Sequence, residues 1–201
     1  MNNEYHSLSS KALNPGTLIT HNRRGKAATI TLDDPAFALM TDFNLIRPFS
    51  TPATTLLEDI NQRMIACGVR LLFIADSNEE LQGLVTYNDL YGEKTLLFIQ
   101  QNGGKREEIT AGDLMTPLNK LEALHFSDIL KSRVGDIVET IKACGRQHLL
   151  VVEDQVVEDQ ANGSKAVTGL FSSTQIEKKL GIKIELSPRA NSFAEVERAL
   201  A

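Results

Sequence analysis

The sequence predicts an α/β protein made of two similar units in tandem, each with the order strand, helix, strand, strand, helix. Three pairs of matching segments, which occur in the same order in both halves, indicate the duplication. The pairs are 38–41 (ALMT) with 113–116 (DLMT), 64–68 (MIACG) with 141–145 (IKACG), and 83–86 (GLVT) with 169–172 (GLFS). We therefore expect two copies of one folding unit.

One amphipathic helix is predicted early in each unit, because apolar residues recur there at the spacing of a single helix face. These residues are Leu57, Ile60 and Met64 in the first unit and Val134, Ile137 and Ile141 in the second. Thr55 and Glu58 have the spacing of a capping box at the start of the first helix. Gly68 and Gly145 stand where a helix commonly ends in a left-handed glycine.

Short, continuous apolar runs after each helix predict strands that are buried on both faces. The first strands are 71–75 (LLFIA) and 149–152 (LLVV), and the returning strands are 84–86 (LVT) and 166–171 (AVTGLF). A tight turn at 76–78 joins the first pair, and a longer polar loop at 157–165 joins the second. A closing helix is then expected to begin near Asn88 in the first unit and near Ser173 in the second.

The chain is expected to divide into five segments. They are an N-terminal extension (1–37), the first unit with its closing helix (38–101), a linker (102–111), the second unit (112–182) and a C-terminal tail (183–201). Residues 95–101 continue the closing helix until 102–104 (NGG) ends it. The basic cluster 23–26 (RRGK) is expected to be a solvated loop, and Ser192 with Glu195 forms a capping box that opens a short tail helix. We interpret both ends as packing or dimer elements.

Charge and composition exclude several classes of function. Hydrophobic residues make up 42% of the chain and charged residues 23%, which is typical of a soluble globular protein. A formal net charge of −5 leaves no excess of basic charge for a nucleic-acid backbone. The N-terminus has no apolar core of the kind a signal peptide needs, and no segment approaches transmembrane length. We therefore expect a cytoplasmic protein with no nucleic-acid and no membrane partner.

Neither a metal site nor a catalytic centre is predicted. Cys67 and Cys144 form no C-x-x-C motif and are expected to fill small apolar gaps between helix and sheet. The four histidines have no metal-ligand spacing; they are His6, His21, His125 and His148. A Cys67–His148 catalytic pair is disfavoured, because the two residues come from different units and have apolar neighbours. The sequence also has no P-loop and no nucleophile beside a base, so we expect that the protein is not an enzyme.

Residues 38–182 resemble a pair of cystathionine-beta-synthase (CBS) domains, the tandem that is also called a Bateman module. Gly83, Thr86 and Asp89 match the family's pattern of glycine, hydrophobic, any, Thr/Ser, any, any, Asp/Asn, and 115–117 (MTP) is typical of the opening of a second unit. The resemblance implies two units packed sheet to sheet with pseudo-two-fold symmetry and clefts between them. It also implies an adenosine-containing ligand (AMP, ADP, ATP or S-adenosylmethionine), no required cofactor, and assembly into a homodimer. We expect a stand-alone pair whose regulated partner is a protein on another chain.

Two interpretations of the 83–89 stretch (GLVTYND) are open. In the first, Thr86 and Asp89 only cap a helix. In the second, a phosphate lies at the helix N-terminus with the Thr86 hydroxyl as a donor, and Asp89 accepts hydrogen bonds from two ribose hydroxyls. Gly83 then lets the backbone approach the ligand. Arg70, just before the buried strand, is either a phosphate ligand or a surface arginine.

The second unit offers a weaker candidate site. Gly169, Ser172 and Gln175 occupy the matching positions, so the capping box is expected to be retained while the carboxylate is lost. A neutral amide offers one acceptor oxygen and no charge. We therefore expect one competent nucleotide site per chain and a non-catalytic regulatory module. The alternative is a ligand-free CBS scaffold that acts as a dimeric protein-interaction module.

Overall fold

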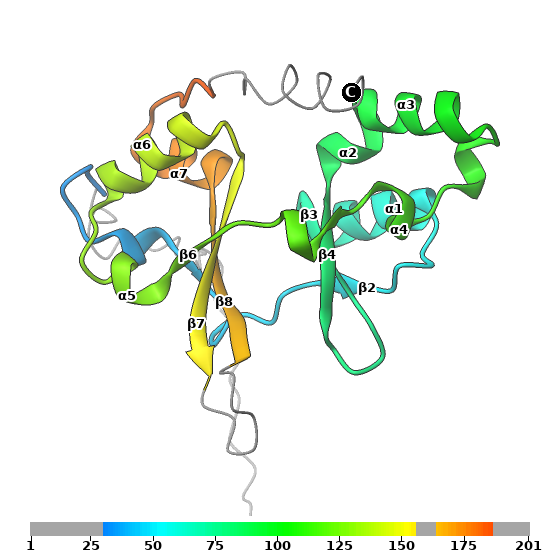
Figure 1. Ribbon diagram of the computed structural model, residues 1–201. Helices are drawn as coiled ribbons and strands as arrows, with labels where there is room; N and C mark the ends of the chain where they lie inside the picture. Colours follow the sequence, from blue (N-terminus) through cyan, green and yellow to red (C-terminus); the bar gives the residue numbers. More distant parts are fainter. Residues whose placement is uncertain (1–29, 156–163, 187–201) are drawn as a thin grey trace, which may run out of the picture.

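The computed structural model describes residues 30–155 and 164–186, and it contains the duplicated order that the sequence predicts (Figure 1). The first unit comprises β2 (Ser50–Thr51), α1 (Leu57–Cys67), β3 (Leu71–Ala75), β4 (Leu81–Thr86) and α2 (Tyr87–Tyr91). The second comprises β6 (Ala123–His125), α6 (Val134–Cys144), β7 (His148–Gln155), β8 (Ser164–Ser172) and α7 (Ser173–Leu180). The predicted order of strand, helix, strand, strand, helix is thus confirmed in both halves.

Shorter elements precede and join the two units. A 3-10 turn η1 (Ala36–Leu39) and the strand β1 (Thr41–Asp42) come before the first unit. Between the units lie α3 (Glu93–Asn102), η2 (Arg106–Glu108), α4 (Ala111–Leu114), β5 (Thr116–Pro117) and η3 (Leu118–Lys120), and α5 (Phe126–Ile129) lies within the second unit. The predicted closing helix of the first unit is therefore two helices, because α2 ends at Gly92 and α3 begins with Glu93.

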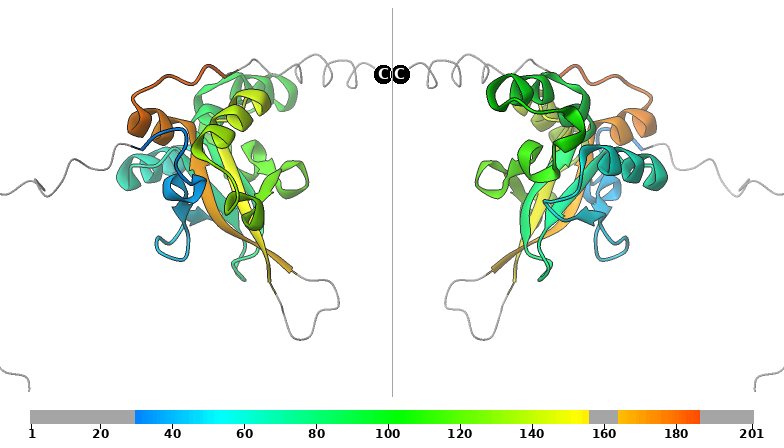
Figure 2. Two further views of the ribbon diagram at one scale, coloured as in Figure 1. Left: turned by 90° about the vertical axis from the view of Figure 1, so that its left-hand side faces the viewer. Right: turned by 90° about the vertical axis from the view of Figure 1, so that its right-hand side faces the viewer.

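The described residues form two four-stranded sheets, one in each unit. Their strand orders are β2-β3-β4-β5 in the first and β1-β8-β7-β6 in the second. The strands before and after the long helix are parallel, β2 with β3 and β6 with β7, because the helix carries the chain back to the same end of the sheet. The next pairs, β3 with β4 and β7 with β8, are antiparallel. The β7–β8 hairpin extends well beyond the helices (Figure 2).

The strand that leads into each unit pairs with the sheet of the other unit. β1 pairs with β8, placing Asp42 opposite Gly169, and β5 pairs with β4, placing Pro117 opposite Gly83. Each exchange covers a sheet edge that would otherwise be open. It also confirms that 38–41 and 113–116 are equivalent segments of the repeat.

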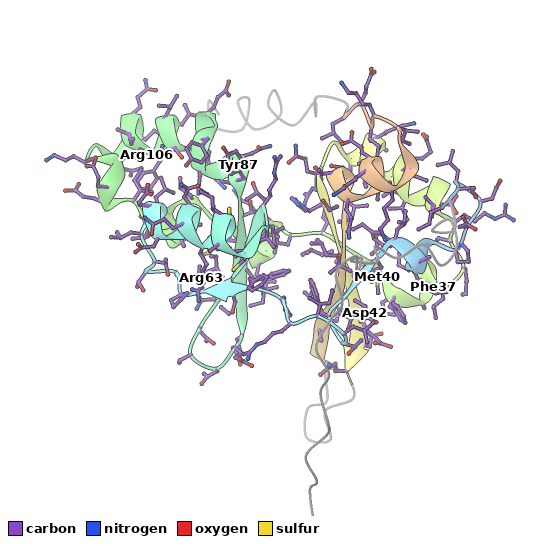
Figure 3. All side chains as sticks on the ribbon, turned by 180° about the vertical axis from the view of Figure 1, so that it is seen from behind. Phe37, Met40, Asp42, Arg63, Tyr87 and Arg106 are labelled. Carbon is purple, nitrogen blue, oxygen red and sulfur yellow. The ribbon has the colours of Figure 1, made fainter. Side chains whose placement is uncertain are left out.

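The packing consequently differs from the expected division of the chain at 37/38 and 111/112. Ala36 and Leu39 are buried in the core of the second unit, and Figure 3 shows Phe37, Met40 and Asp42 on that unit. Residues of the expected linker, among them Ile109 and Ala111, are buried in the core of the first unit. A sequence boundary cannot show this exchange, because it depends on which sheet edge accepts the strand.

Three apolar clusters hold the fold together. One lies under the helices of each unit, where one face of the sheet meets the helices. It includes Leu72 and Ile60 in the first unit and Val151 and Ile141 in the second. The third joins the opposite faces of the two sheets and contains Leu71, Phe73, Leu84 and Leu150. The central strands are thus buried on both faces, as predicted, and the units pack sheet to sheet.

The helix ends were predicted better than the helix starts. Gly68 and Gly145 take left-handed conformations, with φ of 65° and 61°, and α3 ends at Gly103 as expected. The predicted capping box of Thr55 and Glu58 is wrong: the α1 N-cap is Leu56, without a side-chain cap. The Leu57 N–H donates instead to the Ile109 carbonyl at 2.9 Å, so a neighbouring chain segment replaces the side chain.

Several predicted features lie outside the described residues. They are the basic cluster 23–26, His6, His21, most of the 157–165 loop, and the tail capping box of Ser192 and Glu195. In the described ranges, no helix combines the length and apolar character that a membrane crossing requires. In the same ranges, no three His, Cys, Asp or Glu side chains gather in a way that could hold a metal ion.

Candidate functional site

A cavity of about 500 Å³ lies between the two units, beside the junction of β4 and α2. Thr86 and Asp89 line it from the first unit, and Arg146 and His148 line it from the second. The volume falls in the range of small-molecule sites in proteins. The cavity therefore exists only because the two units pack together.

Thr86 and Asp89 form a complete capping box at the start of α2. The Thr86 N–H and the Thr86 hydroxyl each donate to Asp89 Oδ2 at 2.7 Å, and the Asp89 N–H donates to Thr86 Oγ1 at 3.4 Å. The other carboxylate oxygen, Oδ1, pairs with Lys94 Nζ at 3.1 Å. The capping interpretation of these two residues is thus confirmed.

This geometry changes what Asp89 and Thr86 can offer a ligand. A carboxylate oxygen has about two acceptor sites, so Thr86 fills Oδ2 while Lys94 leaves one place on Oδ1. Asp89 can therefore accept one hydrogen bond from a ribose hydroxyl as it stands. The two ribose hydrogen bonds that we expected require Lys94 to move away. The Thr86 hydroxyl hydrogen is directed at Asp89, so the expected donation to a phosphate is not available in this arrangement.

The N-terminus of α2 is also a poor phosphate site. The helix has five residues before Gly92, which leaves few aligned peptide dipoles. Its first-turn N–H groups are partly occupied, because the Tyr87 N–H donates to the Arg70 carbonyl at 2.9 Å and the Asp89 N–H is capped. The expected phosphate position at this helix end is therefore not supported by the structure.

Gly83 is required by the packing of the sheet. A methyl group on its Cα would come within 2.5 Å of the Thr116 carbonyl oxygen and 3.2 Å of Pro117 Cα. Both contacts belong to β5, the exchanged strand. Gly83 thus allows the strand exchange between units, and its expected role in ligand access stays a prediction.

Arg70 lies at the edge of the site but not on the cavity wall. Its guanidinium lies over the Tyr87 ring, 5.6 Å from the ring centroid, and it is not among the residues that line the cavity. Figure 3 marks the position of Tyr87 on the first unit. The positive charge of Arg70 nevertheless helps to lower the pKa of His148, which lines the cavity.

The basic residues on the cavity wall were missed by the sequence analysis. They are Lys94, Lys120, Arg146 and His148, and Arg146 pairs with Glu122 at 2.9 Å. One signal in the repeat could have identified Arg146. It directly follows the helix-ending Gly145, whereas the matching residue after Gly68 is the uncharged Val69. Pseudo-two-fold packing places this turn of one unit opposite the capping junction of the other.

His148 is held uncharged by its surroundings. Burial lowers the pKa of His148 from 6.5 to about 4, and the positive charge of Arg70 adds to this shift. The equivalent residue in the first unit is Leu71, one of the apolar residues between the sheets. The second unit therefore has an imidazole on the cavity wall at the position where the first unit has a buried leucine.

The corresponding junction of the second unit is arranged differently. Ser172 is the N-cap of α7 but makes no side-chain cap bond, so the predicted Ser172–Gln175 capping box is wrong. Gln175 Oε1 instead accepts a hydrogen bond from the Thr41 hydroxyl at 3.3 Å. Above Gly169, the Met40 side chain fills the space, with its sulfur 2.6 Å from where a methyl group would stand.

The fold is similar to that of several solved structures, whereas no protein-family model and no curated protein matches the sequence. The structure is similar to an uncharacterized conserved protein from Pyrococcus horikoshii, with 14% identity, 79% of this chain and 100% of that chain covered, and a TM-score of 0.50.

Two further similar structures are complexes with adenosine-containing ligands. One is CBSX2 from Arabidopsis thaliana in complex with AMP, at 19% identity, 72% and 94% coverage of this and that chain, and a TM-score of 0.46. The other is the CBS domain pair of protein MJ0100 in complex with 5′-methylthioadenosine and S-adenosyl-L-methionine, at 17% identity, 74% and 97% coverage, and a TM-score of 0.48. Identities this low bear on the fold alone.

The chain shares its fold with the Pyrococcus horikoshii protein. The chain consists of two β-α-β-β-α units that face each other through their sheets and exchange their lead-in strands. The fold class that the repeats predict is therefore confirmed.

Proposed function

We propose that the protein is a non-catalytic regulatory module that binds an adenosine-containing ligand, such as AMP, ADP or ATP, in the cavity between its two units. The observation that carries this proposal is the composition of the cavity wall. The capping junction of the first unit, with Thr86 and Asp89, faces basic side chains of the second unit across about 500 Å³. Such a wall offers acceptors for a ribose on one side and cations for a phosphate on the other.

Each part of the ligand has a matching part of the wall. Leu84, Leu150 and Met115 line the cavity and supply apolar surface for the faces of an adenine ring. Asp89 Oδ1 retains an acceptor place for one ribose hydroxyl, and a carboxylate gives stronger hydrogen bonds than a neutral group. At the junction of Gly169, Ser172 and Gln175, the Gln175 side chain is bonded to Thr41 and no carboxylate matches Asp89, so the proposal does not extend to a second site. We propose one ligand per chain.

Regulation follows from the position of the cavity. A ligand that contacts both units stabilises the packing arrangement to which it binds best, in proportion to its difference in affinity between arrangements. The change is then passed to a homodimer partner or to a regulated protein on another chain. No bond is made or broken in this function.

The alternative proposal is a ligand-free scaffold, and two observations favour it. The Asp89 carboxylate already has Thr86 and Lys94 as partners, so the site is satisfied without a ligand. The α2 and α3 region also exposes apolar side chains, with Leu96 at 68% and Tyr91 at 51% of their accessible surface. Exposed tyrosine and leucine side chains are available for protein contacts.

Thermal unfolding with and without AMP distinguishes the two proposals. A ligand at a hundred times its dissociation constant stabilises a folded protein by about 2.7 kcal/mol. We expect a shift of this order for the intact protein, a much smaller one for Asp89→Ala, and an unchanged one for the matched control Gln175→Ala. Each variant is compared with its own ligand-free state, because Asp89→Ala also removes the cap. No shift with AMP, ADP, ATP or S-adenosylmethionine would favour the scaffold.

A further inference from the structure

The charged residues of the cavity wall are unevenly distributed. Lys94, Lys120 and Arg146 line it as cations, and Asp89 and Glu122 line it as anions, which leaves an excess of one positive charge. The chain as a whole carries a net charge of −5. A positive wall on a negative protein is a local feature of this cavity and not a consequence of overall composition.

Both carboxylates on the wall already have cationic partners. Asp89 pairs with Lys94 at 3.1 Å and Glu122 with Arg146 at 2.9 Å. Within the described part of the chain, Lys120 forms no ion pair. A cationic ligand would therefore meet carboxylates whose charge is balanced, together with a lysine that repels it. An anionic ligand would meet that lysine and could share Arg146 with Glu122.

His148, another polar residue on the wall, also favours an anionic ligand. His148 lies on the wall near the guanidinium of Arg70, and its imidazole is neutral at physiological pH. A neutral imidazole can donate one hydrogen bond to a phosphate oxygen. The Arg70 charge beside it adds positive potential on the second unit's side of the cavity and does not favour a second cation there.

We propose that this cavity selects adenosine ligands by charge, accepting a 5′-phosphate and rejecting a sulfonium, with Arg146, Lys120 and His148 as the phosphate contacts. This inference rests on the proposed function and adds the ligand class and the residues that determine it. Arg146 is the principal contact. It is only 25% exposed, and a guanidinium can form two parallel hydrogen bonds with a phosphate.

Three soluble probes separate the contributions of charge and of the nucleoside. AMP carries a phosphate dianion, adenosine carries no charge at this position, and S-adenosylmethionine carries a sulfonium. We expect isothermal titration of the full chain to give AMP the highest affinity, with adenosine at least tenfold weaker and S-adenosylmethionine weaker than adenosine. The AMP advantage should decrease as salt rises, because part of it is unshielded charge attraction.

Variants identify the residues responsible. Arg146→Gln should weaken AMP roughly tenfold to a hundredfold, the range of a charge-assisted hydrogen bond, and should change adenosine affinity by less than about twofold. Arg133→Gln is the matched control, since Arg133 belongs to the same unit but pairs with Asp33 on an exposed surface, and it should leave both affinities unchanged. Glu122→Gln removes the competitor for Arg146 and should tighten AMP several-fold.

The outcomes separate this inference from the proposed function. If AMP, adenosine and S-adenosylmethionine bind equally well, or if Arg146→Gln weakens AMP and adenosine to the same extent, charge selection is wrong while the adenosine site stands. If none of the three probes binds, charge selection is wrong, and if ADP and ATP also fail to bind, the proposed function is wrong. Preferential AMP binding that Arg146→Gln abolishes supports both.

Discussion

The two strand-to-helix junctions of this protein, 83–89 and 169–175, derive from the same repeat and differ in what they can do. At the first, Thr86 and Asp89 close a capping box on the wall of a cavity. At the second, Ser172 makes no side-chain cap and Gln175 is bonded to Thr41. The comparison teaches that two copies of one backbone motif can differ in capping and in the charged groups that they present.

The glycines of the two junctions should differ most in their tolerance of substitution. Gly83→Ala places a methyl group 2.5 Å from a backbone oxygen of β5, whereas Gly169→Ala meets the flexible side chain of Met40. Backbone cannot move aside as readily as a methionine side chain. We expect Gly83→Ala to lower the free energy of unfolding by about 3 kcal/mol and Gly169→Ala by about 1 kcal/mol. Urea unfolding of both variants measures the difference, and equal losses would contradict it.

The next largest difference concerns His148 and its counterpart Leu71. The folded pKa of His148 is about 4, below the ordinary 6.5, so between these values the unfolded chain binds a proton that the folded protein does not. Stability is then complete above pH 6.5 and declines as the pH falls toward 4. At about 1.4 kcal/mol per pKa unit, and with partial exposure of the ring, the loss is about 2 kcal/mol.

Unfolding measured across this pH range tests the assignment. His148→Leu should reduce the acid-dependent part of the loss, because the titrating group is replaced by the residue of the sister unit. His125→Gln is the control, since this histidine pairs with Asp154 away from the inter-unit cavity. An identical pH profile for His148→Leu and the unmodified protein would show that other groups cause the acid sensitivity.

The smallest expected difference is in the caps themselves. Thr86→Ala removes a hydroxyl that bonds Asp89, and loss of such an N-cap costs about 1 kcal/mol. Ser172→Ala removes a hydroxyl that makes no cap, and it should cost less than about 0.5 kcal/mol. Thermal unfolding of the two variants, with Thr86→Ser as a variant that restores the cap, measures this contrast. A larger loss for Ser172→Ala would mean that the second junction is capped in solution.

Sequence patterns predicted what depends on local spacing. The matching segments, the glycines that end α1 and α6, and the strands buried on both faces all follow from short-range periodicity or from the conformational freedom of glycine. The capping boxes were harder, because other partners compete for the same groups. Thr55 bonds Thr51, four residues before it, at 2.7 Å, and Gln175 bonds Thr41 from a distant part of the chain. The spacing of a capping box takes neither competitor into account.

The site was only half predictable for a similar reason. Thr86 and Asp89 carry a recognisable motif, but the basic wall opposite them belongs to the other unit. Arg146 became a site residue only when pseudo-two-fold packing placed the turn after α6 across the cavity from Asp89. An alignment of the repeats can identify a residue such as Arg146. For this, the turn after the long helix of one unit must be matched with the capping junction of the other unit.

A crystal structure of the full chain soaked with AMP tests the central claim most directly. The account predicts ligand density between Asp89 and Arg146, with the phosphate next to Arg146 and His148, and no ligand beside Gln175. Density beside Gln175 in its place, or a cavity that stays empty at saturating AMP, would contradict the account.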